Sequence, residues 1–267
     1  MAATPLLELR GVDKSFGPVQ VLHDVALSVY PGEVTALVGD NGAGKSTMVK
    51  CISGIYSIDA GSVIFDGKEV AIHSPRDASA LGIEVVYQDL ALCDNLDIVQ
   101  NMFLGREKKR GVVLDEPTME QMAGETLKSL SVRTVKSLRQ HVSSLSGGQR
   151  QTVAIAKAVL WNSRVVILDE PTAALGVAQT AQVLELVRRL ADNGLGVVLI
   201  SHNMNDVFAV ADRIAALYLG RMAAQVKTTD VTHSQVVELI TAGRSGNIGL
   251  PPEKPSDFVD ITPGDDR

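Results

Sequence analysis

The segment "GDNGAGKST", Gly39 to Thr47, constrains the fold more than any other part of this chain. It satisfies the pattern Gly-x-x-x-x-Gly-Lys-Ser/Thr and directly follows the apolar run "VTALV", which predicts a buried strand. Glycines let backbone N–H groups turn inward, and a helix that begins near Lys45 adds the positive end of its dipole. A chance match is expected on the order of one time in a hundred. The segment therefore predicts a strand, an anion-binding loop and a helix.

The side chains of this loop fit a nucleoside triphosphate with its cation. Lys45 would reach the β- and γ-phosphates, and the Ser46 hydroxyl would ligate Mg²⁺. We therefore expect ATP and Mg²⁺ as cofactors. The residues assigned to nucleotide binding are Gly39, Asn41, Gly42, Ala43, Gly44, Lys45, Ser46 and Thr47. Kinases, GTPases and many ATPases share such a P-loop, so the loop alone does not choose among them.

Hydrophobic patterning predicts an α/β fold around the loop. Residues 6–38 contain strand-like runs separated by the turn-forming "SFGP" and "YPG", which predicts an opening antiparallel β unit. The runs "RVVIL" at 164–168 and "GVVLI" at 196–200 are continuously apolar after their first residue, as in parallel strands that are buried on both faces. Helices are expected near 177–192 and 204–211.

The same patterning divides the chain into regions. Residues 95–160 lack such a strand run and show helical spacing, which predicts a helical insertion into the α/β core. We treat residues 1–244 as one domain. Residues 245–267 are rich in Pro, Gly and Asp, and we expect them to form a disordered tail.

The composition excludes several classes of protein. A net charge of −6 argues against a nucleic-acid partner, because phosphate binding leaves a basic footprint. Cys51 and Cys93 are too few for a disulfide framework and lack the spacing of a zinc site. No secretory leader and no run of about 18 apolar residues is present, so we expect neither secretion nor a membrane span.

The sequence "LSGGQ", Leu145 to Gln149, narrows the choice among nucleotide-binding proteins. It resembles the signature of the ATP-binding cassette (ABC) ATPases and precedes a segment with helical apolar spacing. A hydroxyl, bare backbone amides and a helix N-terminus would form a second anion site from Ser146, Gly147, Gly148 and Gln149. A plain Ser/Gly helix cap is the structural alternative.

The resemblance implies a P-loop NTPase of the ABC cassette type, with an N-terminal antiparallel β subdomain, a parallel-sheet core and a helical insertion. In that family two cassettes face head to tail, and the signature of one closes over the γ-phosphate held by the other. This chain has one P-loop and one signature. A second cassette is therefore implied as a partner, most simply a second copy in a homodimer.

Three further residues take their expected roles from the resemblance. Gln88, in "VVYQDLALCDNL", matches the glutamine that approaches Mg²⁺ and the attacking water. His202, in "VVLISHNMNDV", matches the histidine that contacts the γ-phosphate. Phe16, in "DKSFG", fits the aromatic residue that stacks on adenine, with a hairpin-core phenylalanine as the alternative.

The pentapeptide LDEPT occurs twice, and the copy at 168–172 matches the Walker B segment of ABC ATPases. It follows the apolar "RVVI" and comes after the signature. The resemblance implies that Asp169 holds Mg²⁺. It also implies that Glu170 is the catalytic residue that orients or deprotonates the attacking water. We therefore expect this copy to be catalytic, together with Gln88 and His202.

The copy at 114–118 has a different context. It follows the charged "REKKRG", and Thr118 with Gln121 predicts a capping box at a helix start. Asp115 and Glu116 are then expected just outside that helix, without a catalytic role.

The particular wording of three segments narrows the resemblance further. "GDNGAGKST", "EPTAALGVAQT" and "SHNMNDVFAVADRIAALYLGR" are most similar to the ATPases of bacterial monosaccharide importers of the ribose, xylose and fructose kind. This implies an ATP-hydrolysing subunit, peripheral at the cytoplasmic face of the inner membrane, with transmembrane permease subunits as partners. An extracytoplasmic sugar-binding receptor would be an indirect partner, and residues 88–96 would pass motion to the permease.

Two departures and two rival functions remain. The loop after the second LDEPT has Gly176 where the family commonly has aspartate, and importers of this kind often carry two cassettes in one chain. A soluble regulatory ABC ATPase and an importer of a non-sugar substrate are the alternatives. A P-loop kinase would not explain LSGGQ.

Overall fold

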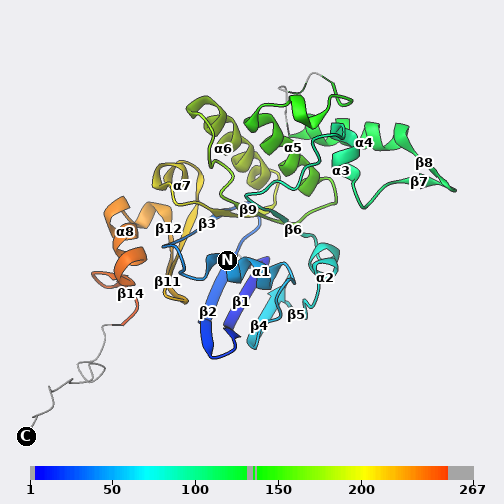
Figure 1. The fold of residues 1–267 in the computed structure, drawn as a ribbon. Helices are drawn as coiled ribbons and strands as arrows, with labels where there is room; N and C mark the ends of the chain where they lie inside the picture. The colour runs from blue at the N-terminus through cyan, green and yellow to red at the C-terminus, as the bar shows by residue number, and fades with distance from the viewer. Residues whose placement is uncertain (1–3, 131–134, 136, 252–267) are drawn as a thin grey trace, which may run out of the picture.

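A six-stranded sheet forms the centre of the computed structural model, which describes residues 4–130, 135 and 137–251 (Figure 1). Its spatial order is β12-β11-β3-β10-β9-β6, and each neighbouring pair is parallel except β11 with β12. The strands are β3 (Val34–Gly39), β6 (Ile83–Val86), β9 (Val165–Asp169), β10 (Gly196–Ile200), β11 (Arg213–Tyr218) and β12 (Arg221–Lys227). The predicted α/β fold with a parallel core is confirmed.

Both faces of this sheet are covered, which explains the uninterrupted apolar runs. In β9, Val165 and Ile167 belong to one hydrophobic cluster, whereas Val166 and Leu168 belong to another. β10 divides its side chains between the same two clusters. Because successive side chains of a strand point to opposite faces, only an all-apolar run can fill both.

A second, antiparallel sheet has the order β2-β1-β4-β5. Its strands are β1 (Leu7–Phe16), β2 (Val19–Val29), β4 (Ala60–Phe65) and β5 (Lys68–Val70). The expected opening unit is confirmed for β1 and β2, but its third run is not part of it. β3 instead lies between β11 and β10 in the parallel sheet, because residues 34–38 are all buried and the strand pairs on both sides.

Helices fill the space on both sides of the central sheet (Figure 1). α1 (Lys45–Ile52) packs in the cluster shared by the two sheets, and α3 (Ile98–Phe103), α4 (Glu116–Ser129), α5 (Gly147–Val159) and α6 (Val177–Asp192) build the cluster on the other face. The remaining helices are α2 (Pro75–Ala80), α7 (Met204–Val210) and α8 (His233–Ala242), with 3-10 turns at Val142–Ser144 and Thr228–Asp230. Of the helices in the described part of the chain, none has both the length and the apolar composition needed to cross a bilayer.

The helical expectations are met with small differences. α6 coincides with the predicted 177–192, and α7 with the predicted 204–211 apart from its last residue. α3, α4 and α5 fall in the interval 95–160, but so does a hairpin of β7 (Lys109–Arg110) and β8 (Val113–Leu114), where no strand was expected.

The first LDEPT copy begins α4, although not through the expected cap. Asp115 is the N-cap, and its carboxylate accepts a hydrogen bond from the Thr118 backbone N–H at 3.4 Å. Glu116 lies inside the first turn, and the Gln121 amide donates to Glu125 along the helix. The predicted Thr118–Gln121 capping box is therefore wrong, because aspartate caps at least as well as threonine and stands three residues earlier.

The end of the described chain is more ordered than the sequence indicated. α8 ends at Ala242 with Gly243 as its C-cap, and β13 (Arg244–Ser245) pairs with β14 (Ile248–Gly249) next to it. Ser245 is buried and its hydroxyl donates to Glu238 of α8. Residues 245–251 are therefore not part of a disordered tail as expected, and the rest of that predicted tail, 252–267, lies outside the described residues.

Asn101 of α3 fixes the segment that leads into the helical region. Its side chain is fully buried, and its Oδ1 accepts a hydrogen bond from the Cys93 N–H at 2.7 Å. Its Nδ2 donates to the carbonyl oxygens of Cys93 and Asp97, both at 3.0 Å. One side chain thus ties the backbone of Cys93 to the N-terminus of α3.

We expect Asn101→Ala to lower the free energy of unfolding by about 2–4 kcal/mol, because it removes the hydrogen bonds of a fully buried amide and leaves the Cys93 N–H without its acceptor. Urea unfolding followed by circular dichroism measures the change. Asn205→Ala, at an exposed position on α7, is the matched control and should stay within about 0.5 kcal/mol of the parent. Equal losses in both variants would contradict this role.

Candidate functional site

The carboxyl ends of three parallel strands bring the predicted residues to one edge of the sheet. Ile200 of β10 lies opposite Asp169 of β9 on one side and opposite Leu37 of β3 on the other. The loops after β9 and β10 therefore begin at the same level, and the loop after β3 begins two residues further along, after Gly39. Open α/β sheets bind ligands at this edge.

The loop after β3 turns tightly into α1. Gly44 is the N-cap of that helix with φ 104°, a conformation that favours glycine. A Cβ on Gly39 would lie 2.5 Å from the Leu217 carbonyl oxygen, so the backbone approach also requires glycine there. The Lys45 ammonium donates to the carbonyl oxygens of Gly39 at 2.7 Å and Asp40 at 3.0 Å. The loop thus holds the positively charged Lys45 ammonium beside the N-terminus of α1.

Burial shifts the charges of this region toward their neutral forms. Desolvation lowers the pKa of Lys45, against the opposing effect of Glu170 and other carboxylates. Desolvation also raises the pKa of Asp169, the neighbouring Glu170 carboxylate raises it further, and Lys45 opposes both. A ligand that carries both an anion and a cation would complement this arrangement.

The second LDEPT copy turns sharply at the end of β9. Glu170 has φ 49°, and its N–H donates to the Ile200 carbonyl oxygen at 3.0 Å. Its Oε2 lies 2.9 Å from Nδ1 of His202, which is the second residue after the end of β10. The Glu170 side chain is 15% exposed and that of His202 is 77% exposed. The largely buried carboxylate of Glu170 is therefore paired with the solvent-exposed imidazole of His202.

A second pair joins the same two loops. The Thr172 hydroxyl donates to the Asp206 carboxylate at 2.7 Å, and Asp206 is buried in the first turn of α7. Sequence reasoning missed this pair, because no spacing rule links an acidic residue in one helix to a threonine in a distant loop. The bond fixes the loop after Glu170 relative to the loop that carries His202.

These loops surround an open cleft of about 750 Å³. The predicted residues that line it are Gly39, Asn41, Gly42, Gly44, Lys45, Ser46, Thr47, Gln88, Asp169, Glu170 and His202. Val21, Asp40, Ala173 and Ile200 also line it and were not singled out from the sequence. The structure thus brings together residues from four separate loops.

Apart from the signature residues, two predicted residues lie outside the lining of this cleft. Ala43 is buried in the hydrophobic cluster between the two sheets. Phe16, the last residue of β1, is exposed, and its ring meets the Tyr56 ring edge-on at 5.1 Å between centroids. Stacking of Phe16 on adenine stays a prediction.

The signature residues lie apart from the cleft, because none of its described lining residues comes from 145–149. Ser146 caps α5, accepting a hydrogen bond from the Gln149 N–H at 3.4 Å, and the Gln149 side chain accepts one from the Ser146 N–H at 2.9 Å. A Cβ on Gly148 would lie 3.1 Å from Cβ of Gln179, so α5 packs closely on α6. A Cβ on Gly147 would lie 3.2 Å from Leu175. The helix cap is present, and the second anion site stays a prediction.

The parallel sheet, the glycine loop and the cleft define a P-loop nucleotide-binding protein. The family model described as ABC transporter matches residues 22–173. The chain belongs to the ABC transporter family, of which it is an ATP-binding cassette.

Relatives and solved structures extend this similarity over most of the chain. The chain is 44% identical over 245 residues to the xylose/arabinose import ATP-binding protein XylG of Sulfolobus acidocaldarius, covering 92% of this chain and 97% of that protein. It is 47% identical over 251 residues to the fructose import ATP-binding protein FrcA of Rhizobium meliloti, covering 91% and 96%. A nucleotide-free ATP-binding cassette from an ABC transporter superposes with a TM-score of 0.77 at 23% identity, covering 90% and 96%. A dimeric bacterial ABC transporter cassette superposes with a TM-score of 0.69 at 26% identity, covering 83% and 98%.

We expect Asp169→Asn to raise the melting temperature at pH 7, in chelating buffer without nucleotide. Burial raises the pKa of Asp169 in the folded chain. At every pH above the pKa of the unfolded chain, ionisation of Asp169 therefore costs the folded state stability. The gain should therefore shrink as the pH falls and vanish below about 3.8, the unfolded value. Asp115→Asn is the control from the other LDEPT copy and should change little, because asparagine caps a helix as well as aspartate. A gain that does not depend on pH would exclude this cause.

Proposed function

We propose that this chain hydrolyses ATP to drive a membrane importer whose substrate is a monosaccharide. The observation that carries the proposal is the single cleft that gathers Lys45, Asp169, Glu170 and His202. XylG and FrcA, which match nearly the whole chain, are named as import ATP-binding proteins for xylose/arabinose and for fructose. The proposal extends that role to this chain.

The cleft also suits Mg²⁺. Ser46, Gln88 and Asp169 line it and offer the oxygen donors that this cation prefers. Within the part of the chain that the structure describes, no group of three His, Cys, Asp or Glu side chains is placed to hold a metal. This agrees with a cation that completes its shell with phosphate and water. When bound, it would offset the negative charge of the β- and γ-phosphates.

Glu170 is the residue that we assign to the attacking water. Its carboxylate would orient or deprotonate the water, whose oxygen bonds to the γ-phosphorus as the bond to ADP breaks. His202 lies 2.9 Å from that carboxylate and is exposed, and we assign it to contact with the γ-phosphate. Lys45 and the loop amides would stabilise the charge that develops on the phosphate oxygens.

The working form that we propose is a pair of cassettes. Because Ser146, Gly147, Gly148 and Gln149 lie apart from the cleft, one chain does not bring both proposed anion sites to one nucleotide. A head-to-tail homodimer would do so, and a similar cassette has been solved as a dimer. Phe16 would then stack on the adenine. Gly176, the N-cap of α6, has no side chain and would contribute only backbone to the contact between the cassettes.

The partners that we propose are transmembrane permease subunits, with an extracytoplasmic sugar-binding receptor acting through them. The chain would then work as a peripheral subunit at the cytoplasmic face of the inner membrane. An importer of another substrate and a soluble regulatory ATPase are the alternatives. The names of XylG and FrcA favour sugar import over both.

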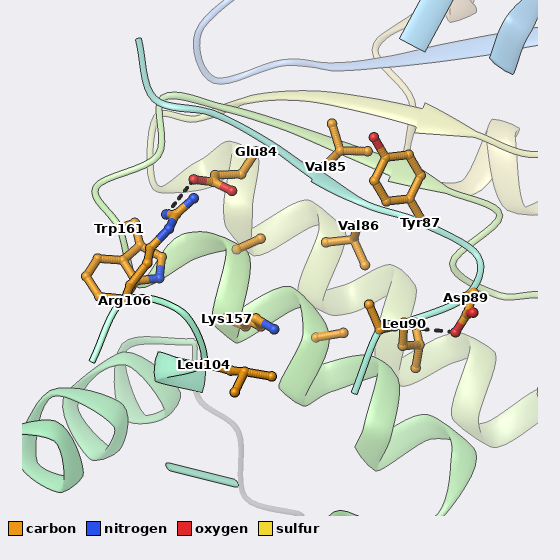
Figure 2. A pocket seen from close by; sticks show the side chains of 13 residues that line it. Glu84, Val85, Val86, Tyr87, Asp89, Leu90, Leu104, Arg106, Lys157 and Trp161 are labelled. Atoms are coloured by element: carbon orange, nitrogen blue, oxygen red, sulfur yellow. Dashed lines mark hydrogen bonds and ion pairs between the residues drawn. The ribbon is translucent and has the colours of Figure 1, made fainter. Parts of the chain in front are cut away.

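A groove of about 280 Å³ next to Gln88 is the surface that we propose for permease docking (Figure 2). Tyr87, Asp89 and Leu90 line it on the strand side, and Leu104 and Trp161 on the helical side. Lys157 also lines the groove, where desolvation lowers its pKa. Tyr87 and Asp89 line the groove and flank Gln88, which lines the cleft. A permease segment bound in the groove would therefore move with Gln88.

Glu170→Gln should abolish steady-state ATP hydrolysis, by roughly a hundredfold or more, while ATP binding is kept. Phosphate release and nucleotide binding measure the two properties. Glu116→Gln, from the other LDEPT copy, is the matched control, because Glu116 instead pairs with Arg139 at 3.1 Å. Loss of hydrolysis in the Glu116 variant, with Glu170→Gln active, would refute the assignment.

Leu104→Asp should lower ATP-driven sugar uptake by the complex purified from membranes and reconstituted, by about tenfold, since it places a charge in the groove. Hydrolysis by the detached chain should be unaffected. Leu219→Asp, at another exposed leucine outside the groove lining, is the control. Normal uptake with Leu104→Asp would exclude the groove as the docking surface.

A further inference from the structure

The β7–β8 hairpin projects from the body of the molecule between α3 and α4 (Figure 1). Every residue from 104 to 114 is exposed. The hairpin is nonetheless ordered: Lys109 pairs with Leu114, Arg110 pairs with Val113, and the Asp115 N–H donates to the Lys108 carbonyl oxygen at 2.9 Å. Asp115 then caps α4, so the hairpin has a fixed base.

The tip of the hairpin is aliphatic and open to solvent. Val112 is 100% exposed, Val113 is 65% exposed and Leu114 is 47% exposed. Val112 is not buried at all by the fold, and Val113 and Leu114 are buried only in part. Their exposure is unfavourable in water and would be relieved by any apolar layer they could enter.

Basic side chains surround this tip, although the whole chain carries a net charge of −6. Arg106, Lys108, Lys109 and Arg110 fall within five residues. The nearby acids are turned toward the backbone: Glu107 accepts a hydrogen bond from the Gly105 N–H at 2.9 Å. Asp115 caps α4, and its ion pair with Arg110 is long at 3.6 Å and leaves that arginine side chain 85% exposed. The exposed segment 104–114 thus carries four basic side chains and one acidic side chain, Glu107.

The hairpin lies on the same side of the molecule as the docking groove. Arg106 and Lys108 stand over the ring of Trp161, at 5.3 Å and 5.6 Å from its centroid. Trp161 and Arg106 both line the groove, and Figure 2 shows Arg106 between Glu84 and the indole. On the proposed function, a permease seated in that groove would bring the membrane surface to this side.

We propose that the β7–β8 hairpin binds the anionic headgroup surface of the membrane, with Val112 and Val113 entering the interface and Lys109 and Arg110 pairing with phosphates. This inference rests on the proposed function. Basic residues beside aliphatic ones are the composition that binds anionic lipid interfaces. A protein partner would need about 800 Å² on each side, which two two-residue strands do not offer.

The test is sedimentation of the full chain with phosphatidylcholine vesicles, with or without an equal part of phosphatidylglycerol. We expect binding only to the anionic vesicles at low salt, with loss of binding near 0.5 M salt because screening shortens the range of the attraction. The double variant Lys109→Gln/Arg110→Gln should lower the partition coefficient about 30-fold, from about fivefold for each charge. Val112→Ser should lower it by about fivefold.

Matched variants elsewhere on the surface serve as controls. Lys68→Gln/Lys227→Gln removes two other exposed cations, and Val177→Ser replaces another valine that is 91% exposed. Both should bind vesicles as the parent does. Absence of binding to anionic vesicles, or equal losses in hairpin and control variants, would overturn the proposal. Hairpin variants that weaken only co-purification with the permease would overturn it in favour of an acidic protein segment.

ATP hydrolysis in solution separates this inference from the function on which it rests. Hairpin variants should hydrolyse ATP like the parent chain. A parent chain that hydrolyses ATP but ignores anionic vesicles would refute only the lipid contact. A parent chain that binds the vesicles through the hairpin but hydrolyses no ATP would refute the proposed function instead.

Discussion

The parallel register of β3, β9 and β10 is the constraint on which the cleft depends. Ile200 is level with Asp169 and with Leu37, so the three strands bring their loops to the same edge of the sheet, within two residues of one another. A shift of one residue in β9 would exchange its two buried faces and turn Asp169 away from its present direction. Burial of the apolar side chains on both faces therefore fixes the strand register, and the register in turn fixes the position of Asp169.

The cleft is assembled at some expense of stability. Glu170 and Ala174 both adopt positive φ, at 49° and 59°, within the loop after β9, and such conformations cost of order 1–3 kcal/mol each. Burial also disfavours the charged forms of Asp169 and Lys45. The Thr172–Asp206 bond and the Glu170 N–H bond to Ile200 hold the loop in place against these costs. A bound nucleotide with its cation would recover part of the electrostatic penalty.

Sequence reasoning succeeded where one physical rule dominated. The apolar runs of β9 and β10 marked a sheet covered on both faces, and the glycine pattern marked the loop after β3. It failed where two rules competed or where partners were remote. Asp115 replaced Thr118 as a cap because both residues are good caps, and only the backbone geometry decides between them. The Thr172–Asp206 pair left no local trace, and residues 245–251 owe their order to packing on α8.

The separation of the signature from the cleft has a consequence for how turnover responds to concentration. If each nucleotide needs the P-loop of one chain and the signature of another, the rate of hydrolysis at low concentration rises with the square of the amount of chain. A solitary subunit would then be idle, and a surplus of subunits would consume little ATP. A permease that binds two copies side by side would raise their effective concentration, so that dimerisation no longer depends on diffusional encounter and hydrolysis proceeds at low amounts of chain.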